Sequence, residues 1–100
     1  MSYEVIADAS PARVVLSGAV DILDAAPLWR ALLDVATHAA PLQVELHHCV
    51  DVDAAVLQLL LALRRSREGD GRQVEFVGAN ERMRRLLARF GIVVPQPASS

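Results

Sequence analysis

The chain has 100 residues, of which 53% are hydrophobic and 22% charged, and its formal net charge is −2 at pH 7. A chain of this length and composition folds around a single core, which excludes a disordered or multi-domain protein. The small negative charge excludes a strong overall attraction to nucleic acid, so no nucleic-acid partner is expected.

The charge and hydropathy pattern of the sequence does not indicate a targeting signal or a membrane segment. The first nine residues contain no basic segment followed by a long apolar one, so they do not resemble a secretory signal. The longest apolar run, residues 54–63, is about half of the ~20 residues that span a bilayer, which predicts no membrane insertion. The single Cys49 cannot form an internal disulfide, in keeping with a reducing compartment. We therefore expect a cytoplasmic location.

The chain begins with a predicted hairpin and a helix. Residues 3–7 and 13–17 are rich in β-branched side chains and are separated by turn-prone residues 8–11, which indicates two antiparallel strands. Apolar residues then recur at helical spacing over residues 24–39, where Pro27 would fit the first helical turn. Pro41 closes this helix.

A third strand and a second helix follow. Residues 42–46 alternate apolar and polar side chains, which predicts a strand, and His47, His48 and Cys49 are expected in a polar loop. Asp53 is a favoured helix N-cap, and the helix it starts runs to about residue 68, before glycines 69 and 71.

The last predicted elements are a strand over residues 73–77 and a helix capped by Asn80. The helix carries one apolar stripe, formed by Met83, Leu86, Leu87 and Phe90, and Gly91 is expected to end it. We expect one domain over residues 1–94 and a flexible C-terminal tail over residues 95–100. The order β-β-α-β-α-β-α predicts a single α/β domain in which three helices pack on a mixed four-stranded sheet.

Several segments resemble one family at matching points of this order. Residues 14–21 read VVLSGAVD, residues 74–80 read VEFVGAN and residues 86–92 read LLARFGI. Residues 52–57 read VDAAVL at the place where the family has I-D-S-S-G-L. The family is STAS, found in sulfate transporters and anti-sigma factor antagonists, and the resemblance covers nearly the whole chain. The segment Pro27-Leu28-Trp29 is similar to the STAS subunits of Mla-type lipid ABC transporters.

The resemblance implies a regulatory interaction module and not an enzyme. In anti-sigma factor antagonists the second hydroxyl residue of the D-S-S-G segment is phosphorylated by the kinase that binds it, and the added charge separates the two proteins. Ala54 and Ala55 stand at these two positions, so Ala55 is a degenerate phosphosite. No Ser, Thr or Tyr lies between Thr37 and Ser66.

The implied partner-binding residues are Asp21, Asp53, Ala54, Ala55 and Val56. Val56 takes the place of the family's glycine near the expected exposed start of the helix, so we expect it to touch a partner. The expected partner is a signalling kinase or an anti-sigma-type ATPase, and the alternative is the ATPase of a Mla-type transporter. Homo-oligomer formation through the apolar helix after Asp53 stays a third possibility.

Other interpretations of these residues are simpler. Capping alone explains Asp53, and a turn at the end of the second strand alone explains Asp21. Metal-ligand residue types cluster over residues 47–53, but adjacent histidines on an extended segment point in opposite directions and no second cluster completes a site. The sequence has no glycine-rich phosphate loop and no nucleophile elbow. We expect no metal, no cofactor and no catalysis.

Overall fold

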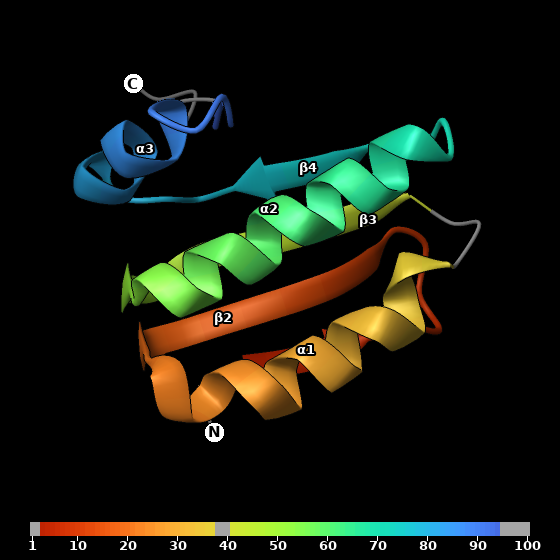
Figure 1. The fold of residues 1–100 in the computed structure, drawn as a ribbon, viewed down its shortest axis with the longest axis horizontal. Coiled ribbons are helices and arrows are strands. Elements are labelled where there is room, and N and C mark those ends of the chain that lie inside the picture. The colour runs from red at the N-terminus through yellow and green to blue at the C-terminus, as the bar shows by residue number, and fades with distance from the viewer. Residues whose placement is uncertain (1–2, 38–40, 95–100) are drawn as a thin grey trace.

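The computed structural model describes residues 3–37 and 41–94 (Figure 1). The elements follow the predicted order: β1 (Tyr3–Ile6), β2 (Ala12–Val20), α1 (Ile22–Ala36), β3 (Leu42–Val52), α2 (Ala54–Gly69), β4 (Val74–Val77) and α3 (Glu81–Ala88). Helix α1 ends at Ala36, earlier than predicted, and residues 38 and 39 of the expected helix lie outside the described residues. The predicted tail, residues 95–100, also lies outside them.

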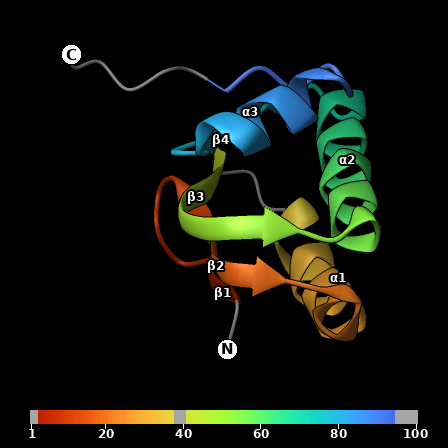
Figure 2. The ribbon, with the colours of Figure 1, turned by 90° about the vertical axis from the view of Figure 1, so that its left-hand side faces the viewer.

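The four strands form one mixed sheet in the order β1-β2-β3-β4. Strand β1 pairs antiparallel with β2, whereas β2, β3 and β4 are parallel, which confirms the predicted fold class. Helices α1 and α2 cover one face of the sheet, and α3 lies at the end to which β4 points (Figures 1 and 2). The carboxyl ends of β2 and β3 and the first turns of α1 and α2 therefore lie at the same end of the domain (Figure 1).

The core lies between the sheet and the two helices. Alternate residues of the central strands are buried on the covered face, such as Val14 and Leu16 of β2, and they pack against apolar side chains of α1 and α2. The uncovered face carries polar pairs instead, since Arg13 and Glu45 form an ion pair of 3.1 Å. This difference between the faces explains why both helices pack on the same side. Within the described residues, no helix has the length and apolar content that crossing a bilayer requires.

Strand β3 is longer than predicted, and the prediction of a polar loop after residue 46 is wrong. His47, His48 and Cys49 lie inside β3, where the pairing with β2 shifts between Val15 and Ser17 and again between Gly18 and Ala19. These irregularities interrupt the alternation, so both histidines are exposed and Cys49 is buried. An extra residue in a strand changes the direction of the side chains that follow it, so the simple alternation of an extended segment does not predict which residues of this part of β3 are exposed.

The His47 ring lies against Gly78, just after β4. Gly78 has a φ of +80°, and a Cβ at this position would lie 2.6 Å from Cγ and Cδ2 of the ring. A Gly78→Ala variant would therefore meet both backbone strain, about 1–2 kcal/mol, and a steric clash. Gly71 is a matched control, because its φ is +75° and no atom lies within 4 Å of the added Cβ.

We expect Gly78→Ala to lower the free energy of unfolding by about 1 kcal/mol more than Gly71→Ala does, measured by urea denaturation. In a His47→Ala background, Gly78→Ala and Gly71→Ala should lower the free energy of unfolding by the same amount, because only the backbone strain then remains. An equal loss in the wild-type background would show that the ring moves aside freely.

Candidate partner-binding site

Asp21 begins α1 as its N-cap. Its Oδ1 accepts a hydrogen bond of 2.9 Å from the Leu23 amide, and Oδ2 of Asp24 accepts one of 3.2 Å from the Asp21 amide. This reciprocal pair is a capping box, which satisfies amides that the first helical turn leaves free. The helix therefore begins at Ile22 and not at residue 24 as predicted. The spacing Asp21-x-x-Asp24 was the sequence signal for this start.

Pro27 consequently lies two residues deeper in α1 than expected, in its second turn. It is inside the helix, so residue 27 cannot donate the hydrogen bond that the Leu23 carbonyl would normally accept. The capping box stabilises the first turn on the N-terminal side of this missing bond.

Asp53 caps α2, as predicted, and also joins two strand ends. Its Oδ1 accepts a hydrogen bond of 3.0 Å from the Ala55 amide, and its own amide donates to the Val20 carbonyl at 2.9 Å. The second bond ties the loop after β3 to the end of β2. Asp53 and Ala54 are exposed, and Ala55 is half-buried. The helix start therefore presents a carboxylate and small side chains to the surroundings.

Val56 does not belong to this surface, and its predicted exposure is wrong. The side chain has no exposed area and lies in the core with Leu57 and Leu60. The reason is the orientation of α2 on the sheet: Val56, Leu60 and Leu63 recur at spacings of four and three residues and form the inward stripe. The stripe includes the third residue of the helix, so burial begins within its first turn.

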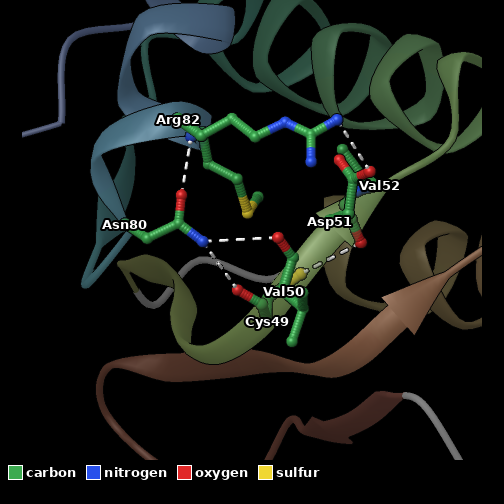
Figure 3. A network of polar contacts seen from close by, with 7 residues as sticks. Cys49, Val50, Asp51, Val52, Asn80 and Arg82 are labelled. Atoms are coloured by element: carbon green, nitrogen blue, oxygen red, sulfur yellow. Dashed lines mark hydrogen bonds and ion pairs between the residues drawn. The ribbon is translucent and has the colours of Figure 1, made fainter.

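A polar network fixes α3 to the end of β3 (Figure 3). Nδ2 of Asn80 donates to the carbonyl oxygens of Val50 and Cys49 at 3.3 and 3.5 Å, while Oδ1 accepts from the Met83 amide at 2.8 Å. Asn80 is thus the predicted cap of α3 and also a link between α3 and β3, a role that its sequence position did not reveal.

Asp51 is the acidic member of the same network. Its Oδ2 lies 3.3 Å from the Arg82 guanidinium, and its Oδ1 accepts from the Val52 amide at 2.9 Å (Figure 3). The Cys49 thiol donates to the Asp51 carbonyl at 3.5 Å, and burial raises the pKa of this thiol, which disfavours the thiolate form. Arg82, on α3, therefore offsets one charge of an otherwise acidic end of the sheet.

The structure brings together the two aspartates that the sequence singled out. Asp21, Asp51 and Asp53 line one shallow cavity of about 160 Å³ together with Ala19, Val20 and Val52. Over residues 3–37 and 41–94, no three His, Cys, Asp or Glu side chains are grouped closely enough to hold a metal ion. The carboxylates can instead attract the cationic side chains of a protein.

The fold and the sequence identify the family. A model described as Mlab, STAS domain, matches residues 4–93. The chain belongs to the STAS family. No curated protein matches it.

Solved structures with the same fold include anti-sigma factor antagonists. The STAS domain is similar to the anti-sigma factor antagonist SpoIIAA in its unphosphorylated form, with a TM-score of 0.77, 13% identity and coverage of 96% of this chain and 89% of the other. The phosphorylated form of SpoIIAA, a Bacillus cell fate determinant, matches with a TM-score of 0.76 and 12% identity, and the match covers 94% of this chain and 91% of the other. A putative anti-sigma factor antagonist from Thermotoga maritima matches with a TM-score of 0.71 and 16% identity, and the match covers 96% of this chain and 86% of the other. At these identities the likeness establishes the shared fold.

The role of Asp53 as a cap can be separated from its charge. Asp53→Ala removes the hydrogen bond to the Ala55 amide and should lower the free energy of unfolding by about 1 kcal/mol. Asp53→Asn keeps a capping oxygen without the charge and should stay within a few tenths of a kcal/mol of the wild type. Urea denaturation measures both. Equal losses for the two variants would mean that the carboxylate charge, and not the capping oxygen, stabilises the helix start.

Proposed function

We propose that this STAS domain is a non-enzymatic regulatory module that binds a protein partner through the surface formed by the exposed Asp21, Asp53 and Ala54 and the half-buried Ala55. The observation that carries the proposal is the helix start at Ala54 and Ala55, where neither residue has a hydroxyl group. The small exposed side chain of Ala54 and the neighbouring carboxylates can fit a partner surface closely. Because alanine cannot be phosphorylated, a phosphate at position 55 cannot separate the complex. Binding is therefore constitutive or is controlled at another site.

The partner we propose is a signalling kinase or an anti-sigma-type ATPase in the cytoplasm. The similarity of the fold to SpoIIAA, an anti-sigma factor antagonist, supports this class of partner. The acidic cavity between the ends of β2 and β3 fits a partner that presents lysine or arginine at the same point.

A transporter ATPase is the second candidate partner. The match to a family model described as Mlab, STAS domain, favours it, as does the segment Pro27-Leu28-Trp29. Homo-oligomer formation through α2 has less support, because Val56, Leu57, Leu60, Leu61 and Leu63 of this helix are buried in the core of the chain itself.

Site-specific photo-crosslinking in the native cell tests the proposal. A photoreactive amino acid at Ala54 should yield one defined protein adduct, and the same amino acid at Ala88, an exposed alanine on α3, should not yield it. The mass-spectrometric identity of the adduct separates the two partner classes. Phosphatase treatment should leave the yield unchanged. The same adduct from both positions, or an adduct that depends on a phosphate, would contradict the proposal.

A further inference from the structure

The outer surface of α1 is apolar although it contacts no other part of the described chain that would bury it. Ile22 is 64% exposed, Leu23 84%, Trp29 37% and Leu33 50%. Ile22, Ala26, Trp29 and Leu33 follow one another at spacings of four, three and four residues, which places them on one stripe of the helix. Leu28, Leu32 and Val35 form a different stripe, which is buried. We call Ile22, Leu23, Ala26, Trp29 and Leu33 the α1 outer stripe.

The charges around the α1 outer stripe are mostly negative. Asp21 and Asp24 lie at its N-terminal end and Asp34 at its C-terminal end, with Arg30 as the one basic residue of α1. None of the ion pairs described for residues 3–37 and 41–94 uses a side chain of α1. A basic surface would therefore be attracted, whereas an anionic membrane would be repelled.

The charges around the α1 outer stripe argue against a simple pair of identical chains, because two copies of this surface would bring their aspartates together. The stripe begins next to the acidic cavity in the sequence, because Ile22 directly follows Asp21, which lines that cavity. One larger partner could cover both.

We infer that the α1 outer stripe is the second half of the partner-binding surface and receives an amphipathic helix whose apolar residues are flanked by arginine or lysine. This inference rests on the proposed function, since it describes the partner of the same end of the domain. The leucine-type side chains of that helix pack on Trp29 and Leu33, and its basic flanks lie near Asp21, Asp34 and Asp53.

A designed peptide tests this chemistry directly. The probe is an 18-residue synthetic helix with one leucine stripe flanked by arginines, and its counterpart carries glutamates in place of the arginines. In NMR titrations of the isotope-labelled full chain, the arginine peptide should shift the amide signals of residues 21–26 and 28–34 and of Asp53 in a saturable manner. The glutamate peptide should bind at least tenfold more weakly. Shifts located elsewhere, no saturation, or equal affinities would overturn the inference.

Two substitutions locate the contact. Leu33→Ser should lower the affinity of the domain for the arginine peptide about tenfold. Val93→Ser is a matched change at an 83% exposed side chain outside α1, and it should leave this affinity unchanged. Circular dichroism confirms that each variant is folded, and Ile22→Ser replaces Leu33→Ser if the latter is not. A wild-type dimer in sedimentation that Leu33→Ser converts to monomer would assign the stripe to a second copy and contradict the inference.

Crosslinking separates failure of the inference from failure of the proposed function. A photoreactive amino acid at Leu33 should capture the same protein as one at Ala54. Capture at Ala54 alone would leave the proposed function intact and refute the role of the α1 outer stripe. Peptide binding at the stripe with no adduct at Ala54 would contradict the proposed function instead.

Discussion

Val56→Asp will unfold the domain. The Val56 side chain has no exposed area, so the substitution places a carboxylate among the aliphatic side chains of the core. A buried charge without a partner costs more than about 4 kcal/mol, which is comparable with the total stability of about 5–15 kcal/mol of a domain. Far-UV circular dichroism and urea denaturation at pH 7 should show little or no cooperative transition.

Ala54→Asp is the matched control, two residues earlier in the same helix. Ala54 is exposed at the first position of α2, where a negative charge interacts favourably with the helix dipole by about 0.3–1 kcal/mol. We expect this variant to fold with wild-type stability or slightly more. A folded Val56→Asp variant would mean that residue 56 reaches solvent, and it would restore Val56 to the partner-binding surface.

The order of the elements could be predicted because its signals are local. Turn residues between short β-branched segments, Asp53 and Asn80 before helices, and glycines after them each depend on neighbouring residues only. The family motifs then placed these elements in a STAS domain, which the structure and the family model confirm. The irregular pairing within β3 could not be predicted, because it depends on the register against β2.

The site was predicted only in part, because exposure depends on how a helix lies on the sheet. The structure brings Asp21 and Asp53 to one cavity, as the motifs implied, and adds Asp51. Val56 was placed on the wrong side, since an almost wholly apolar helix start gives no sequence signal for which stripe faces inward. The α1 outer stripe was missed for the same reason, because α1 has apolar residues on two sides.

Arg67 was also missed, because an arginine in the last part of a helix is usually exposed. Here it is only 1% exposed, and Nη1 donates to the Val35 carbonyl at 3.2 Å. Val35 lies in the last turn of α1, where the carbonyl oxygens carry a partial negative charge, and its carbonyl also accepts a hydrogen bond from the amide of the C-cap residue, Thr37. Nη1 of Arg72 donates to the Thr37 carbonyl at 2.8 Å, so two arginines stabilise the same helix end.

Arg67→Ala should therefore lower the free energy of unfolding by about 3 kcal/mol, because it leaves a cavity and removes the donor to Val35. Arg67→Met keeps most of the buried volume and removes a charge whose burial is unfavourable. Burial is also what lowers the pKa of the Arg67 guanidinium, together with the nearby charge of Arg72. We expect the methionine variant to lose at most about 1 kcal/mol in urea denaturation. Equal losses would show that the hydrogen bonds of the guanidinium, and not the volume it fills, hold α1 to α2.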